Sequence, residues 1–127
     1  LSTPPELCLH DEFTYEAGRR CAARLFPLRD RFTAVVCGND EHALGLIDEF
    51  ASLGVACPRD ISVVGHDNSR LAARHSPPLT TVRMPWIEMG KAAVELIEQL
   101  RLDPDSAPRP YILFEPELMV RGSVRMI

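Results

Sequence analysis

The sequence lacks the long apolar runs and the basic clusters that mark several large classes of protein. No apolar stretch approaches the roughly 18 to 20 residues that a membrane-spanning helix needs, and the first residues show no secretory signal. The 14 Lys and Arg residues are outnumbered by 18 Asp and Glu, for a net charge of −4. Nucleic-acid-binding domains usually carry a basic face. We therefore expect no membrane partner and no direct contact with DNA from these residues.

Paired cysteine motifs are also missing. The cysteines at 8, 21, 37 and 57 form no CxxC pair, and no histidine stands beside them at metal-ligand spacing. Free cysteines behave as small apolar residues. The spacing therefore predicts reduced thiols that are buried or half-buried, a cytoplasmic location, no metal site and no cofactor.

No motif of a common enzyme class is present. There is no GxSxG elbow, P-loop, GxGxxG or HExxH sequence. His66 and Asp67 are adjacent, but neighbours on a strand point to opposite faces of the sheet, which argues against a catalytic pair. We expect no enzymatic activity.

What is present fits part of one globular domain. The 127 residues are 46% apolar and 25% charged, which is close to the average for folded proteins. The chain starts at Leu1 without an initiator methionine, so we expect a piece of a longer protein. Proline is the one enriched residue, and its 11 copies mark the joints of the chain.

Hydrophobic periodicity predicts an α/β fold. The β-branched run 32–37, an amphipathic helix 40–53 and the strand 61–65 form a βαβ unit, in which parallel strands are joined by a right-handed crossover. Because 32–37 is apolar on both faces, we expect helices on both sides of it. The remaining expected elements are strands 7–9, 79–83, 111–114 and 118–120, helices 15–26, 68–75 and 86–102, and a solvated loop 103–110.

Three residues that follow strands suggest a ligand site, because ligands of open α/β sheets bind beyond the carboxyl ends of the strands. Phe13, Asn39 and Asp67 supply an aromatic face, an amide and a carboxylate, which together suit a polyhydroxylated ligand. Each residue also has a purely structural interpretation. Phe13 can be a hydrophobic staple, Asn39 only a helix N-cap, and Asp67 a turn residue.

Several consecutive motifs resemble the LacI/GalR family of bacterial transcription regulators, which typically has Asn-Asp-x-x-Ala-Leu-Gly where this chain has 39–45. Their order and spacing hold from about residue 10 to 123. The matching segments are 13–18 (FTYEAG), 38–45 (GNDEHALG), 58–69 (PRDISVVGHDNS), 76–83 (SPPLTTVR), 89–90 (MG) and 116–123 (PELMVRGS).

The resemblance implies a partial periplasmic binding protein-like (type I) fold, specifically one parallel-sheet, three-layer lobe. Residues 1–127 match mainly the C-terminal lobe of the effector-binding domain, and 84–116 normally cross to the N-terminal lobe. The implied function is binding of a sugar-like or nucleoside effector that modulates DNA binding by a helix-turn-helix absent from this chain. The alternative is a periplasmic sugar-binding transport receptor of the same fold.

The resemblance also implies roles for single residues. The positions of Asp67 and Asn39 hydrogen-bond the effector in the family, that of Phe13 stacks on it, and that of Trp86 can line the cleft. His66 replaces the usual Phe or Tyr and is expected to add a titratable donor to the cleft. The family forms dimers, and the positions expected at the interface are Leu44 and His75.

Overall fold

The computed structural model describes residues 3–102 and 111–125, so the expected loop 103–110 lies outside the described residues. The chain divides into two compact units. One comprises Leu1–Arg83 with Leu118–Ile127, and the other comprises Met84–Glu117.

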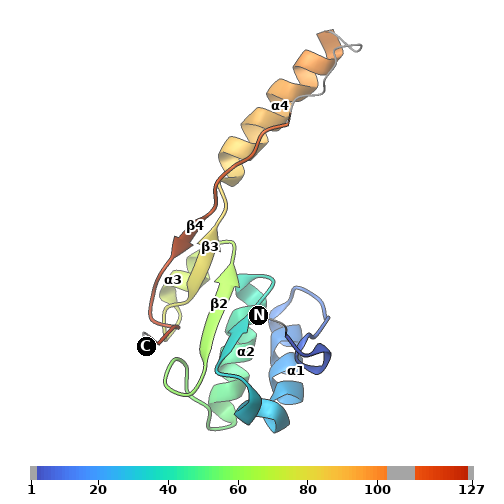
Figure 1. The fold of residues 1–127 in the computed structure, drawn as a ribbon. Helices are drawn as coiled ribbons and strands as arrows, with labels where there is room; N and C mark the ends of the chain where they lie inside the picture. The colour runs from blue at the N-terminus through green and yellow to red at the C-terminus, as the bar shows by residue number, and fades with distance from the viewer. Residues whose placement is uncertain (1–2, 103–110, 126–127) are drawn as a thin grey trace. The chain divides into compact units, whose positions relative to one another are not determined.

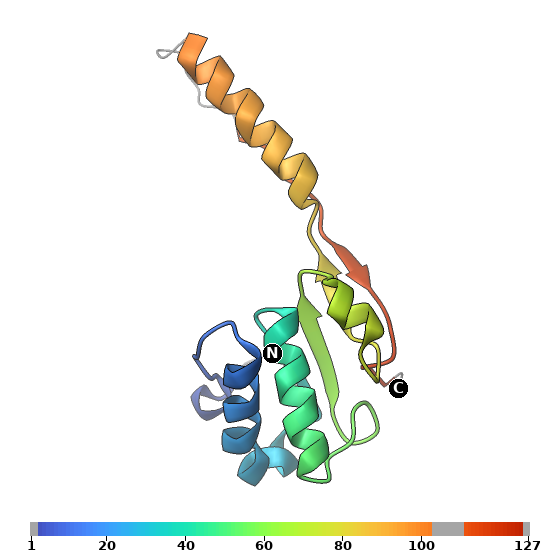
Figure 2. The same cartoon turned by 180° about the vertical axis from the view of Figure 1, so that it is seen from behind.

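A four-stranded sheet forms the first unit (Figure 1). Its strands stand in the order β1-β2-β3-β4. β1, β2 and β3 are parallel, with Val35 opposite Val63 and Gly65 opposite Thr81, whereas β4 runs opposite to β3 (Figures 1 and 2). The parallel pairing of β1 with β2 confirms the βαβ unit. The strands are β1 Ala34–Val36, β2 Ser62–His66, β3 Thr80–Arg83 and β4 Glu117–Met119.

Three helices of this unit lie against one face of the sheet (Figure 2). They are α1 Tyr15–Leu25, α2 Asp40–Ser52 and α3 Arg70–Arg74, with short 3₁₀ turns at Pro5–Leu7 and Phe26–Arg31. Each helix begins after a residue whose side-chain oxygen accepts a hydrogen bond from a backbone N–H of the first turn. The three capping residues are Thr14, Asn39 and Ser69.

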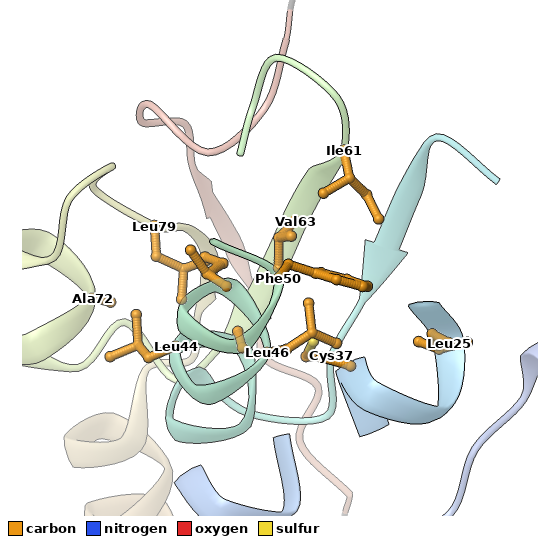
Figure 3. Packing of buried hydrophobic residues seen from close by; sticks show 12 residues of the cluster. Leu25, Cys37, Leu44, Leu46, Phe50, Ile61, Val63, Ala72 and Leu79 are labelled. Atoms are coloured by element: carbon orange, nitrogen blue, oxygen red, sulfur yellow. The ribbon is translucent and has the colours of Figure 1, made fainter. Parts of the chain in front are cut away.

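The core lies between α2 and the sheet. Figure 3 shows Phe50 of α2 beside Val63 of β2, and Leu44 next to Ala72 of α3. All four side chains are buried. Burial of such residues is the main stabilising contribution to a domain of this size, so α2 is the element on which the rest of the unit assembles.

The opposite face of the sheet carries no helix among the described residues (Figure 1). Val36 of β1 is 80% exposed, and β2 alternates between buried Val63 and Gly65 and half-exposed neighbours. The parallel α/β lobe is confirmed, and two of its three layers lie within the described residues. The expectation of helices on both sides of 32–37 is wrong for the described residues. An apolar run shows that a strand can be buried on both faces, but it does not show that a second layer of helices is present.

Two predicted strands are absent from the described residues. Leu7 is the last residue of the 3₁₀ turn Pro5–Leu7, and Cys8 and Leu9 after it do not join the sheet. Residues 111–114 form no strand, and Tyr111 and Leu113 are exposed. Both runs have apolar composition, but a strand also requires a neighbour for its backbone N–H and C=O groups.

The second unit contains the long helix α4, Trp86–Leu102, at the bounds that periodicity predicts. None of the described side chains of α4 is buried. In the described part of the chain, no helix combines the length and apolarity that crossing a membrane requires.

All four cysteines are free, as expected. Cys21 and Cys37 are buried and Cys57 is half-buried, whereas Cys8 is exposed. The expectation of burial is therefore wrong for Cys8, because the strand that was to bury it does not form.

Candidate functional site

The residues that follow β1 and β2 lie at the carboxyl edge of the sheet. Register places Val36 opposite Val64, so both strands end at this edge. Asn39 stands at the N-terminus of α2, and Asp67 follows His66 directly. This is the edge at which open α/β sheets bind ligands.

Asn39 joins α2 to the segment that carries Phe13. Its Oδ1 accepts a hydrogen bond from the backbone N–H of His42 at 2.9 Å, which is the helix cap. Its Nδ2 donates to the backbone carbonyl oxygen of Phe13 at 2.9 Å. Asn39 therefore caps α2, and the same amide also fixes the position of a second predicted site residue; its contact with an effector stays a prediction.

The ring of Phe13 lies over Gly38. It is 66% exposed, and a Cβ at Gly38 would stand only 2.4 Å from its Cε1 atom. The staple interpretation is wrong, since the residue with which a staple would pair is Gly18, which has no side chain. Phe13 also helps to line a cavity of about 180 Å³, together with Leu9, Val35 and other residues.

Asp67 occupies an unusual backbone conformation at the end of β2. Its φ of +118° lies in a region that side chains rarely adopt, and its N–H donates to the carbonyl oxygen of Val82 at 2.9 Å. The side chain is 42% exposed, and its Oδ1 lies 3.1 Å from Nδ1 of His66. The expectation that these neighbours point apart is wrong, because the positive φ turns the chain out of the strand.

A buried carboxylate, that of Asp40, connects the elements at this edge of the sheet. Asp40 is 1% exposed; its Oδ1 accepts from the Thr81 hydroxyl at 2.5 Å, and its Oδ2 accepts from the Ser69 N–H at 2.6 Å. A Cβ at Gly65 would stand 2.4 Å from Asp40 Oδ1. Asp40 is not among the residues that the sequence predicts for the site. A signal was available, because a glycine inside β2 indicates close approach of another group.

Arg121 was also missed as a residue that supports the site. Its guanidinium donates to the Leu79 carbonyl oxygen at 2.8 Å and to the side-chain oxygen of Asn68, the residue after Asp67. Asn68 has a positive φ of 57°. The segment after β4 thus braces the turn that carries Asp67, and this contact between distant parts of the chain has no local signature in the sequence.

The remaining predicted residues lie elsewhere. Trp86 is the first residue of α4 in the second unit and is exposed. Leu44 is buried in the core of its own lobe. His75 bonds through Nε2 to Asp48 at 3.0 Å and through Nδ1 to the Pro77 carbonyl at 3.1 Å. The cleft role of Trp86 and the dimer roles of Leu44 and His75 stay predictions.

Asp48 also accepts a hydrogen bond from the Tyr15 hydroxyl at 2.6 Å, and this contact raises the pKa of Tyr15. Tyr15, Asp48 and His75 come from α1, α2 and the end of α3. The cluster therefore links the three helices.

The chemistry of the strand-end residues is that of recognition. Within residues 3–102 and 111–125, no group of three or more His, Cys, Asp or Glu residues is arranged to hold a metal ion. An exposed aromatic face can stack on the C–H groups of a ligand, and a half-exposed carboxylate can accept hydrogen bonds from its hydroxyls.

Comparison with known proteins identifies relatives of the whole chain. Residues 3–124 match the periplasmic binding protein-like domain. The HTH-type transcriptional regulator MalR of Streptomyces coelicolor is 49% identical over 93% of this chain and 33% of its own length. The HTH-type transcriptional repressor PurR of Photobacterium profundum is 40% identical over 90% and 34%.

A solved structure of a transcriptional regulator has the same fold as this chain. The complex of the transcriptional regulator CelR with cellobiose superimposes with a TM-score of 0.87 at 28% identity, over 97% of this chain and 37% of that one. The chain thus spans about a third of the length of the proteins it matches.

Proposed function

Since the chain belongs to the periplasmic binding protein-like domain family, in the form found in LacI/GalR-type transcriptional regulators, we propose that it is the effector-sensing C-terminal lobe of such a regulator. Its effector is a small sugar-like or nucleoside molecule. CelR, whose structure holds cellobiose, supports the sugar class.

The observation that carries the proposal is the arrangement at the carboxyl edge of the sheet. Asp67 accepts hydrogen bonds from effector hydroxyls, and the exposed ring of Phe13 stacks on the apolar face of the effector. Asn39 both caps α2 and fixes the Phe13 segment. The roles of Asp67 and Phe13 are those that the resemblance implies, whereas Asn39, for which the resemblance implies a hydrogen bond to the effector, acts here through the Phe13 segment.

The second unit supplies the connection to the rest of the regulator. Residues 84–116 cross to the N-terminal lobe, and the apolar side chains of α4, none of them buried in this chain, pack there. An effector held between two lobes stabilises one closure state. Coupling of that state to a helix-turn-helix shifts affinity for DNA by typically about 1–3 kcal/mol.

The proposal includes a homodimer in the cytoplasm that contacts DNA only through the helix-turn-helix domain, and no enzymatic step. The names of the curated relatives support a regulator over a transport receptor, since both are HTH-type proteins. A receptor of the same fold would respond to its ligand without any change in DNA binding.

Thermal unfolding of the full-length protein in the presence of candidate ligands tests the proposal. The panel comprises neutral sugars, sugar phosphates, nucleosides and purines. At about 100 times its Kd, an effector adds roughly 2.7 kcal/mol to the free energy of unfolding. We expect a rise in Tm with one compound, which Asp67→Ala abolishes and Asp30→Ala, an exposed aspartate of the Phe26–Arg31 turn, leaves intact.

The effector must then also change binding to operator DNA. An effector that raises Tm but leaves DNA binding unaltered contradicts the regulator and favours the receptor. An unchanged response in the Asp67→Ala variant contradicts the assignment of the site.

A further inference from the structure

His66 is a partly exposed residue at the carboxyl edge of the sheet. It is the last residue of β2 and lies on the face opposite to the buried Val63 and Gly65, with its side chain 36% exposed. Its neighbour in the ladder is Val82. Within residues 3–102 and 111–125, the hydrogen-bond partner of this imidazole is Asp67.

The contact with Asp67 determines which nitrogen of His66 carries the proton. Nδ1 of His66 lies 3.1 Å from Oδ1 of Asp67. An ionised carboxylate is only an acceptor, so Nδ1 must donate. In the neutral imidazole the second nitrogen, Nε2, then carries a lone pair and is itself an acceptor.

We propose that His66 is a specificity-determining residue of the effector site, in which its Nε2 and the Oδ2 of Asp67 accept hydrogen bonds from two neighbouring hydroxyl groups of a neutral sugar. The inference rests on the function proposed above and narrows the effector class. It depends on the positive φ of Asp67, which brings the two side chains to the same side of the chain.

Physical reasons favour a neutral sugar over other ligands. Two acceptors side by side match two donors, and adjacent sugar hydroxyls supply them. The carboxylate of Asp67 repels phosphates and carboxylates. The relative CelR, whose structure holds cellobiose, supports a sugar as the source of the two donors.

Two variants of the full-length protein test the two ring nitrogens of His66 separately. His66→Phe keeps a ring but removes both nitrogens. His66→Asn places an amide donor near the position of Nδ1 and has nothing at the position of Nε2. We expect calorimetric titration with cellobiose, maltose and ribose at pH 8 to show about tenfold weaker binding in His66→Phe. His66→Asn should fall between that variant and the wild type, because Asp67 stays oriented.

Deoxy analogues of the sugar that binds give a readout that a structural role of His66 would not move. In the wild type, removing one of the two hydroxyls should weaken binding about tenfold. In His66→Phe, removing the hydroxyl that donates to Nε2 in the wild type should weaken binding much less. An equal loss in both proteins overturns the proposal.

Nitrogen NMR of the imidazole tests the geometry without a ligand. At pH 8 we expect the ring proton of His66 on Nδ1 in the wild type, and a shift towards the Nε2–H form in Asp67→Asn. The exposed His10 serves as the reference in both proteins. An Nε2–H ring in the wild type overturns the proposal.

Failure of this inference is distinguishable from failure of the proposed function. If His66→Phe binds sugar as the wild type does, or if the wild type binds a purine and no sugar, the role of His66 is wrong and effector sensing stands. If the wild type binds nothing in the panel, both are wrong.

Discussion

At the scale of single residues, the same atoms serve folding and recognition. The Asn39 side chain caps α2 through Oδ1 and holds the Phe13 backbone through Nδ2. The two contacts use opposite ends of one amide, so they respond differently to substitution. This allows the structural role of Asn39 to be separated from its role in the site.

Asn39→Asp keeps an acceptor for the helix cap but has no N–H for the Phe13 carbonyl. We expect Asn39→Asp to lower the free energy of unfolding by about 1 kcal/mol through the lost bond to Phe13, and Asn39→Ala to lower it by about 1 kcal/mol more because the helix cap is lost as well. Both variants should bind effector more weakly. Urea denaturation and calorimetric titration measure the two quantities. If Asn39→Asp binds effector at full strength, Asn39 is only a cap.

Thiol reactivity provides a second test at this scale. Burial raises the pKa of Cys37 to about 12 and that of Cys57 to about 11, so neither forms the reactive thiolate near neutral pH. Iodoacetamide at pH 7.5 should therefore modify the exposed Cys8 first. Peptide mass spectrometry over time checks the order, with Cys8→Ser as the control. Early modification of Cys37 contradicts the burial described here.

At the scale of elements, close contact between α1 and α2 positions both helix N-termini near the site. The contact is reciprocal. A Cβ at Gly18 would stand 2.0 Å from the His42 carbonyl oxygen, and a Cβ at Gly45 would stand 2.0 Å from the Tyr15 carbonyl oxygen. Only glycine permits the two backbones to approach so closely.

Gly45→Ala should therefore lower the free energy of unfolding by about 1–3 kcal/mol or more, because the added methyl group meets backbone that cannot rotate away. Gly90→Ala is the matched control. Gly90 lies within α4, and a Cβ there meets nothing within 4 Å, so alanine should be neutral or stabilise the helix by about 0.5–1 kcal/mol. Equal effects of the two substitutions, measured by urea denaturation, would contradict the packing of α1 on α2.

At the scale of the whole molecule, the two units differ in how they are stabilised. The first unit has a buried core centred on Phe50 and Val63. The second contains α4, whose described side chains are all at least partly exposed. A helix that buries none of its side chains depends on its own backbone hydrogen bonds and is only marginally stable in water.

Hydrogen exchange of the 127-residue chain should reveal this difference. We expect the amides of α2 and β2 to be the most protected from exchange. The amides of α4 should exchange by local opening, with a free energy of opening that is a small fraction of the one for α2 and β2. In the full-length protein, α4 should become protected if the N-terminal lobe covers it. Equal protection of α4 and α2 in the 127-residue chain would show that α4 is buried by some other contact.

Local patterns in the sequence predict most elements of the fold. Thr14 and Asn39 cap the starts of α1 and α2, and Gly54, with a φ of +81°, follows the end of α2. The strands that fail, 7–9 and 111–114, are those whose partners do not stand beside them. The local pattern indicates that a segment favours a strand conformation, but the pairing of strands depends on residues that are distant in the chain.

The sequence by itself determined the α/β class and the βαβ unit, because these follow from local periodicity, capping and recurring motifs. Only the tertiary structure decided how Phe13, Asn39 and Asp67 are held. The buried Asp40 between Thr81 and Ser69, the brace from Arg121 to Asn68, and the contact of His66 with Asp67 join atoms whose proximity is set by packing and backbone conformation. Such contacts have no period or spacing in the sequence, since they form only when distant segments meet.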